Sequence, residues 1–166
     1  DGLGDACDET DDRVPDAPVD VCAMTPEDQA MLDAVNAFRA GTRSCGEEGS
    51  FSPAAPLSWS CQLETAALAH STEMANNRFF SHTGSDGSSA GDRAARAGFN
   101  WSSWGENIAA GGAYYSVGAV LQGWIDSPGH CANLMRPYFT HLGAARYSDT
   151  SSAYGVYWTQ VFGSPR

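Results

Sequence analysis

The chain contains no lysine, and all nine of its basic residues are arginines. This absence excludes enzymes that need a phosphate-loop lysine, a Schiff-base lysine or a Ser-Lys dyad. No stretch approaches the roughly 20 apolar residues of a membrane-spanning helix, and the N-terminus shows no signal-peptide pattern. We therefore expect a soluble protein outside these three enzyme classes.

Positive charge is scarce as well: twenty acidic residues give a formal net charge of −11 at pH 7. Residues 1–28 hold half of the acids and a single arginine, whereas residues 29–166 hold ten acids and eight arginines. Binding to nucleic acid requires a basic surface, and an anionic membrane also attracts cations. The composition therefore predicts neither of these partners.

The five cysteines include no Cys-x-x-Cys pair. In a chain of this polarity the spacing predicts disulfides formed in an oxidising compartment rather than a zinc cluster. A domain near 166 residues also buries enough surface for an ordinary hydrophobic core. We expect a secreted or cell-surface monomer with one domain and an appendage.

The appendage is the acidic segment 1–23. Asp1, Asp5 and Asp8 are closely spaced, with Gly2 and Gly4 between the first two, an arrangement that lets carboxylate oxygens converge on Ca²⁺. These residues resemble the closing part of a thrombospondin type 3 calcium repeat, which implies a calcium site. The alternative is a solvated acidic linker, and the prolines that follow also favour an extended linker. The folded domain is predicted to occupy residues 24–166.

Three residues in this domain are predicted to begin helices. Thr25 precedes Pro26 and two acids, Ser60 precedes an apolar stripe, and Ser89 has capping-box spacing to an aspartate. The Ser60 helix places His70 on its buried face, where we expect a hydrogen-bonded core histidine. A further helix is predicted to end at a Pro-Gly break, Pro128-Gly129.

The end of the chain alternates between apolar and polar residues. Residues 141–147 and 153–162 are separated by a polar Ser-Asp-Thr-Ser-Ser turn, so they predict an antiparallel hairpin. Helices would then cover a small sheet. The fold class is predicted to be α+β, with an α-β-α sandwich as the architecture.

Three residues are candidates for chemistry. His82 lies between two phenylalanines and a Thr-Gly turn, Glu106 lies between glycine and asparagine, and His130 follows the Pro-Gly break. We expect loops to supply all three. Two histidines and a carboxylate can hold a divalent metal or perform acid-base chemistry, because both roles need unprotonated donors that converge. The alternative is that they are separate surface or capping residues.

Several motifs occur in a family-specific order. They are Phe-Phe-Ser-His-Thr-Gly at 79–84, Gly-Glu-Asn-Ile-Ala at 105–109, Gly-Trp-Ile-Asp-Ser-Pro-Gly-His-Cys-Ala-Asn-Leu-Met at 123–135, and Tyr-Trp-Thr-Gln-Val-Phe at 157–162. From about residue 25 to 163 the chain resembles the CAP superfamily, the cysteine-rich secretory, antigen 5 and pathogenesis-related 1 proteins, in its compact bacterial form. The resemblance implies a three-layer α-β-α sandwich with a cleft lined by two histidines and two acids.

The resemblance places the first histidine on His82, the glutamate on Glu106 and the second histidine on His130. Longer members carry a further glutamate after the tryptophan of the third motif, and Asp126 is the nearest acid here. The resulting prediction is a zinc-like divalent site at the two histidines. Glu106 would serve either as a third ligand or as the group that orients a ring.

Three functions are compatible with these residues. The first is a binding module for an extracellular lipid, glycan or protein, and the resemblance implies lipid or sterol binding. The second is a protease-like hydrolase with His82 or His130 as base, and with Ser81, Ser127 or metal-bound water as nucleophile. In the third, the histidines only lock loops together. We favour the binding module.

The resemblance to compact bacterial relatives also implies a disulfide between Cys45 and Cys131. Cys22 precedes the first helix and Cys61 starts the second, so these two are predicted to pair. The alternative pairs Cys22 with Cys7, because successive cysteines in calcium repeats often form disulfides.

Overall fold

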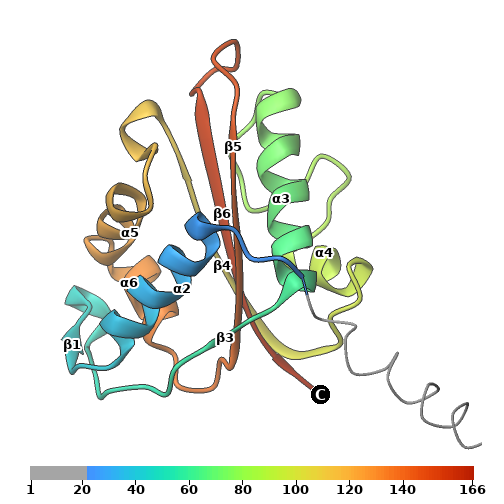
Figure 1. Ribbon diagram of the computed structural model, residues 1–166. Helices are drawn as coiled ribbons and strands as arrows, with labels where there is room; N and C mark the ends of the chain where they lie inside the picture. Colours follow the sequence, from blue (N-terminus) through green and yellow to red (C-terminus); the bar gives the residue numbers. More distant parts are fainter. Residues whose placement is uncertain (1–21) are drawn as a thin grey trace, which may run out of the picture.

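The computed structural model describes residues 22–166 and centres on a four-stranded sheet of order β3-β5-β6-β4 (Figure 1). The strands are β3 (Ser58–Trp59), β5 (His141–Ser148), β6 (Val156–Pro165) and β4 (Trp101–Ala110). The pairs β4–β6 and β5–β6 are antiparallel, which confirms the C-terminal hairpin. The short β3 adds to β5 in parallel, so the complete sheet is mixed.

Helices cover both faces of this sheet. One layer contains α2 (Pro26–Arg39), α5 (Val117–Ile125) and α6 (Pro128–Met135), and the other contains α3 (Cys61–Asn76) and α4 (Ala90–Arg96). Figure 1 shows the sheet edge-on between the two layers. The predicted three-layer α-β-α sandwich is thus confirmed.

The connections contain shorter elements. The loop after α2 forms a small antiparallel pair, β1 (Arg43–Ser44) and β2 (Ser50–Phe51), around the 3₁₀ turn η2 (Gly46–Glu48). A second 3₁₀ turn, η3 (Gly112–Tyr114), leads from β4 to α5.

The predicted helix starts are confirmed by their hydrogen bonds. Thr25 and Ser89 each accept from the backbone N–H three residues later and form complete capping boxes. The hydroxyl of Ser60 accepts from Leu63 N at 3.1 Å. Each cap satisfies backbone donors that the first helical turn leaves free.

Two local predictions are wrong. Pro128 does not end a helix, because α5 already stops at Ile125 and Pro128 is the first residue of α6. Proline suits that position, where its missing N–H is not needed, and His130 is therefore helical. Glu106 lies within β4, paired with Val161, rather than in a loop. Pairing with β6 outweighs the low strand propensity of the neighbouring glycine and asparagine.

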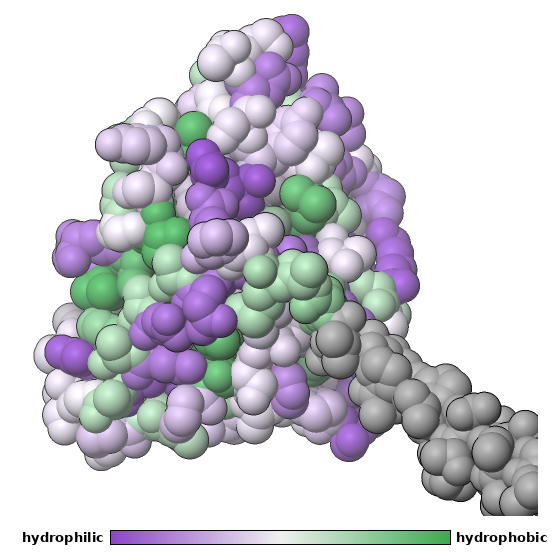
Figure 2. Space-filling view, viewed as in Figure 1, coloured by the Kyte–Doolittle hydropathy of each residue, from purple (hydrophilic) through white to green (hydrophobic). Residues whose placement is uncertain are grey.

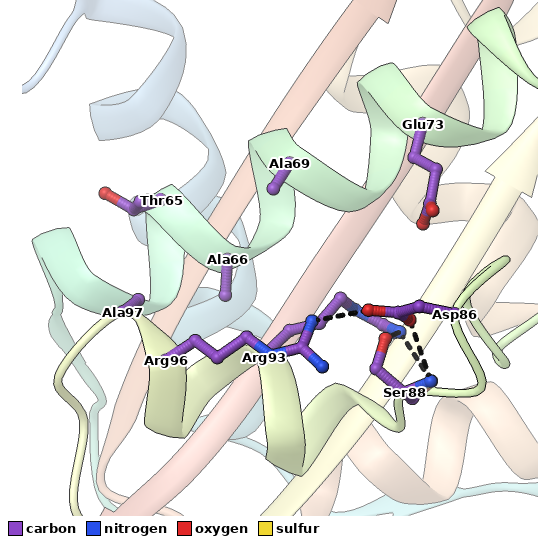
Figure 3. Close-up of a pocket in the computed structure, with 9 residues that line it drawn as sticks. All are labelled: Thr65, Ala66, Ala69, Glu73, Asp86, Ser88, Arg93, Arg96 and Ala97. Carbon is purple, nitrogen blue, oxygen red and sulfur yellow. Dashed lines mark hydrogen bonds and ion pairs between the residues drawn. The ribbon is translucent and has the colours of Figure 1, made fainter.

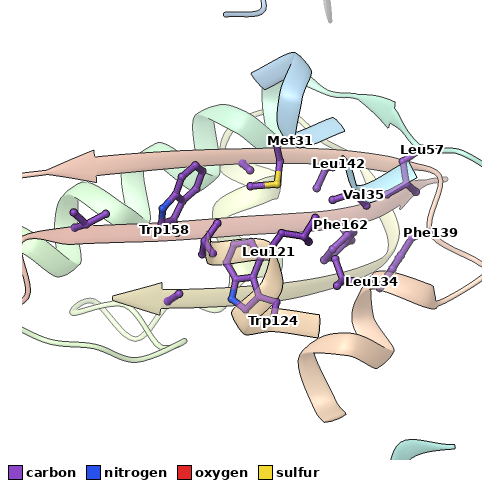
Figure 4. Close-up of a cluster of buried hydrophobic side chains, with 14 residues drawn as sticks. Met31, Val35, Leu57, Leu121, Trp124, Leu134, Phe139, Leu142, Trp158 and Phe162 are labelled. Atoms are coloured by element: carbon purple, nitrogen blue, oxygen red, sulfur yellow. The ribbon is translucent and has the colours of Figure 1, made fainter. Parts of the chain in front are cut away.

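The main hydrophobic core lies between the sheet and the α2, α5 and α6 layer (Figure 4). Trp124 and Trp158 are both 1% exposed, and their indole N–H groups donate to Ile108 O and Tyr114 O. Burial of these large side chains therefore leaves no unpaired indole donor.

On the opposite face, α3 packs directly on β5. A Cβ added to Gly143 would lie 2.2 Å from the backbone nitrogen of Glu64, so only glycine permits this approach. The predicted apolar stripe of α3 is buried at Leu63, Ala66, Ala67, His70 and Met74.

Both predicted disulfides are present. Cys45 and Cys131 have Cα atoms 5.5 Å apart and join the loop after α2 to α6. Cys22 and Cys61 join the start of α2 to the start of α3, with Cα atoms 5.7 Å apart. The alternative pairing of Cys22 with Cys7 is therefore wrong.

Several predictions concern the acidic segment 1–23. The proposed calcium ligands Asp1, Asp5 and Asp8, together with Cys7, lie outside the described residues.

The face that carries α2 shows hydrophilic and hydrophobic residues side by side at its surface (Figure 2). Within residues 22–166, no helix is long and apolar enough to cross a bilayer.

Candidate functional site

The candidate site lies along β4, which is the last strand in the sheet order. Its outer edge is covered by side chains, since Asn133 Nδ2 donates to Glu106 O at 3.2 Å and Trp124 Nε1 donates to Ile108 O at 3.0 Å. Successive side chains of a strand point to opposite faces. Glu106 accordingly meets the α3 and α4 layer, whereas Asn107 meets α6, and the two layers approach each other around this edge.

Glu106 is the centre of a buried network. Its Oε1 lies 2.8 Å from His82 Nδ1, and its Oε2 lies 2.8 Å from Arg93 Nη2. The Glu106 side chain is 2% exposed, whereas the His82 side chain is 58% exposed. A carboxylate in this position accepts from Nδ1–H, so neutral His82 keeps the lone pair on Nε2 for another partner.

Arg93 was not predicted as a site residue. Besides Glu106, it donates to Ser88 O at 2.9 Å and to His82 O at 3.0 Å, so it fixes both the carboxylate and the backbone of the histidine. One sequence signal pointed to it. With no lysine in the chain, a buried glutamate can take a permanent counter-ion only from an arginine, and Arg93 lies in the last turn of a short capped helix.

His130 approaches from α6. Its backbone carbonyl accepts from Asn107 Nδ2 at 3.3 Å, and Asn107 is also bonded to Gln160 and Asn133. Partial burial lowers the pKa of His130, and the positive charge of protonated His82 lowers it further. The two predicted histidines therefore interact electrostatically.

His70 lies beneath the network and is fully buried, which confirms the predicted core histidine. Its Nε2 donates to Ser81 O at 2.8 Å, so it holds the backbone immediately before His82. Its Nδ1 has no hydrogen-bond partner among the described residues and lies 3.8 Å from Glu73 Oε1. Burial lowers the pKa of His70, and the nearby charge of Glu106 opposes this effect.

The lowered pKa of His70 predicts a pH-dependent stability. Unfolded histidine takes up a proton near pH 6.5, whereas folded His70 resists protonation, so the free energy of unfolding falls as pH falls through about 6.5. His130 acts in the same direction. We expect a His70→Gln variant to show a shallower slope between pH 7.5 and 5 in urea unfolding with EDTA present. His141→Gln is the control, and a slope equal to the wild type in His70→Gln contradicts the assignment.

Two cavities follow each other along β4. The first, the His82 cavity, has a volume of about 390 Å³ and adjoins Gly105 and Glu106. The second, the His130 cavity, has a volume of about 270 Å³ and adjoins Ile108 to Ala110. The His82 cavity carries polar groups from His82, Thr83, Ser89, Glu106 and Asn133, although more of its surface is apolar than polar, with Trp104 in its wall. The His130 cavity is mainly apolar, with Phe80, Tyr114 and Trp124 in its wall.

A third cavity, of about 390 Å³, lies between α3 and α4, where Ala66 and Ala69 face Arg93 and Arg96 (Figure 3). Asp86 binds Arg96 at its mouth at 2.9 Å. Hydrogen bonds from Ser88 lower the pKa of Asp86 to about 2, and Arg96 adds to this effect. Arg93 lines this cavity while its guanidinium holds Glu106, so the ion pair separates the third cavity from the His82 cavity.

The remaining candidates lie apart from this network. Asp126 is exposed at the end of α5, accepts from Gln122 Nε2 at 2.9 Å and lines neither cavity on β4. Ser81 Oγ accepts from Thr83 N, and Ser127 lines the His130 cavity. Among residues 22–166, no hydroxyl is hydrogen-bonded to the ring of His82 or His130.

Glu106 takes the orienting role toward His82 rather than the role of a third metal ligand. Within residues 22–166 no three His, Cys, Asp or Glu side chains are grouped to hold a metal ion. Both oxygens of Glu106 already bind His82 and Arg93, so this carboxylate is not free to act as a third ligand. A carboxylate on Nδ1 orients the ring and raises the basicity of Nε2.

Comparison with known proteins identifies the family of this chain. Residues 32–162 match the model of the CAP family, described as the cysteine-rich secretory protein family. The Bacillus subtilis proteins YlbC, an uncharacterized membrane protein, and YkwD are 35% and 33% identical over 89 and 107 residues, which are 54% and 64% of this chain. A Bacillus anthracis extracellular protein containing an SCP domain is 30% identical, with a TM-score of 0.64 over 86% of this chain. The matches cover only 25%, 39% and 44% of these three proteins.

Proposed function

This chain belongs to the CAP family, the cysteine-rich secretory protein family, and we propose that it is an extracellular binding domain whose ligand site is the cleft along β4. The observation that carries this proposal is the buried Glu106, which holds Nδ1 of the cavity-lining His82 at 2.8 Å and leaves its Nε2 without a hydrogen-bond partner among the described residues. A ligand site of this kind needs side chains that are fixed before the ligand arrives. Arg93 and His70 supply that rigidity from below.

An extracellular location is supported by the two disulfides, because such bonds persist in oxidising compartments. The similar Bacillus anthracis protein is itself described as extracellular.

We further propose that His82 Nε2 and His130 bind a divalent metal ion, with zinc as the first choice. Imidazole nitrogens are preferred zinc ligands, and two of them leave the remaining positions to water or to a bound ligand. Such an ion would offer a Lewis-acidic position for a ligand oxygen. Glu106 would keep the His82 ring in one orientation.

Calorimetric titration with Zn²⁺ tests this site. We expect binding at pH 7.5 and much weaker binding at pH 5.5, because only neutral imidazole binds metal and protons compete below roughly pH 6. His82→Ala should abolish the binding, whereas His141→Ala, which alters a histidine outside both β4 cavities, should not. Equal affinity at the two pH values, or unchanged binding in His82→Ala, rules out the metal site.

The second candidate function is a histidine-dependent hydrolase. The hydrogen bond between Glu106 and His82 favours it, because a carboxylate that orients an imidazole is part of many hydrolytic sites. Two observations support binding instead. The cation Arg93 lies 2.8 Å from the same carboxylate, which weakens the stabilisation that the carboxylate can offer an imidazolium. Ser81 and Ser127 also lack a hydrogen bond to either ring among the described residues.

A further inference from the structure

Trp104 forms an aromatic wall of the His82 cavity. Its side chain remains 38% exposed although it belongs to β4, next to the buried core. Trp101 packs edge-on against it, with ring centroids 6.4 Å apart. A large, half-exposed ring at the mouth of a cavity that also carries polar groups offers an apolar surface to a ligand.

The position of this ring depends on Gly91 in α4. A Cβ at Gly91 would lie 2.3 Å from Trp104 Nε1 and 2.7 Å from Cδ1, so any larger residue displaces the indole. Glycine inside a helix costs about 0.5–1 kcal/mol relative to alanine. The Gly91 carbonyl also accepts from Trp101 Nε1 at 2.8 Å. Gly91 thus lowers the stability of α4 at the position where this helix contacts Trp101 and Trp104. The same contact fixes the Trp104 ring before a ligand arrives.

The rest of the cavity presents neutral hydrogen-bonding groups. Asn133 uses its Nδ2 for Glu106 O and Asn107 Oδ1, which leaves its Oδ1 as an acceptor. Ser89 Oγ accepts from Asp92 N and keeps its O–H to donate. Thr83 is exposed, and its hydroxyl makes no hydrogen bond with another described residue. Together with His82 Nε2 these groups match a ligand that both donates and accepts at several points.

Charge selects the class of this ligand. Glu106 is the only carboxylate in the lining, and it is neutralised by Arg93, with both side chains 6% exposed or less. The cavity therefore offers no free cation to an anionic ligand and no free anion to a cationic one. An acyl chain would leave the hydroxyls of Thr83 and Ser89 and the Oδ1 of Asn133 without hydrogen-bond partners, which costs free energy.

We propose that the His82 cavity binds a neutral pyranose unit of an extracellular glycan. The C–H face of the sugar packs on the Trp104 indole, and its hydroxyls bond to Thr83, Asn133 and His82. The volume of about 390 Å³ lies within the roughly 300–1,000 Å³ of small-molecule sites. This assignment rests on the proposed function, since it names the ligand class of the same cleft.

An array of neutral and acidic glycans, probed with the labelled protein in EDTA, tests the assignment. We expect binding to neutral pyranose glycans that weakens more than about tenfold in Trp104→Ala, because buried tryptophan contacts dominate such sites. Gly91→Ala should weaken it comparably, since it displaces the indole while keeping Trp104. Tyr115→Ala, which removes a 68% exposed aromatic side chain outside both β4 cavities, should bind normally.

Thr83→Val provides the test if Trp104→Ala fails to fold. It exchanges an exposed hydroxyl for a methyl group, so the fold should be kept while glycan binding weakens several-fold. Capture of no neutral glycan, or neutral-glycan binding unchanged in both Gly91→Ala and Thr83→Val, overturns the proposal. Binding to a peptide array that depends on Trp104, without glycan binding, also overturns it. Zn²⁺ titration of the same preparation separates the two proposals, since zinc binding without glycan binding rejects only the sugar.

Discussion

Replacing both Cys45 and Cys131 by alanine is expected to lower the free energy of unfolding by about 4–5 kcal/mol. The two residues are 86 positions apart. In the chain-entropy model, a cross-link that closes a loop of this length lowers the conformational entropy of the unfolded chain and so stabilises the fold by about 4–5 kcal/mol. Both half-cystines are also buried, against Met135 and the ring of Phe38. Guanidinium unfolding of the oxidised wild type and of the double variant, monitored by tryptophan fluorescence, gives the difference directly.

The Cys22–Cys61 disulfide gives a second value against which the loss of stability can be compared. Cys22 and Cys61 are 39 positions apart, so the same model assigns their cross-link about 4 kcal/mol. Cys22 is exposed, and its replacement leaves no buried void on that side. The double variant at Cys45 and Cys131 should therefore be the less stable of the two. A loss below about 2 kcal/mol there would show that the native bond is strained or that the unfolded chain is already compact.

The disulfide also bears on the site, because Cys131 follows His130 directly in α6. Without the bond, α6 keeps its packing on α2 but loses its covalent link to the loop after that helix. The Cys45–Cys131 disulfide thus helps to fix the position of His130, because the motif Gly-His-Cys makes the two residues neighbours.

The predictable features of the fold have local causes. Thr25, Ser60 and Ser89 cap their helices through hydrogen bonds that span only three residues, so the sequence shows them directly. The apolar stripe of α3 and the alternation of β5 and β6 are equally local patterns. The strand at Glu106 was missed because its partner, β6, lies more than fifty residues away.

The site residues also fall into those that the sequence predicts and those that it does not. The motifs and the family resemblance identified His82, Glu106 and His130, and the structure brings the first two into contact. Arg93 and Asn133 were not assigned roles, because a counter-ion and an amide that reach β4 from separate helices leave no periodic pattern in the sequence. Trp104 was not assigned a role either, since its place in the cavity depends on Gly91 in another element.

The other large effect is expected at Arg93. Arg93→Met keeps most of the side-chain volume and removes the cation, so it leaves Glu106 charged and 2% exposed with only His82 as partner. Removing one member of a buried ion pair typically costs about 3–5 kcal/mol. We expect a loss of this size at pH 7.5 in denaturant unfolding.

Two further variants distinguish the lost ion pair from lost packing. Arg96→Met removes an arginine of the same helix that is 60% exposed and paired with Asp86 at the surface, so its loss should cost about 1 kcal/mol or less. Arg93→Met combined with Glu106→Gln removes both charges and should be more stable than Arg93→Met alone. If the combined variant is no more stable than Arg93→Met, then Arg93 stabilises the fold through its contacts with the carbonyls of Ser88 and His82 rather than as the counter-ion of Glu106.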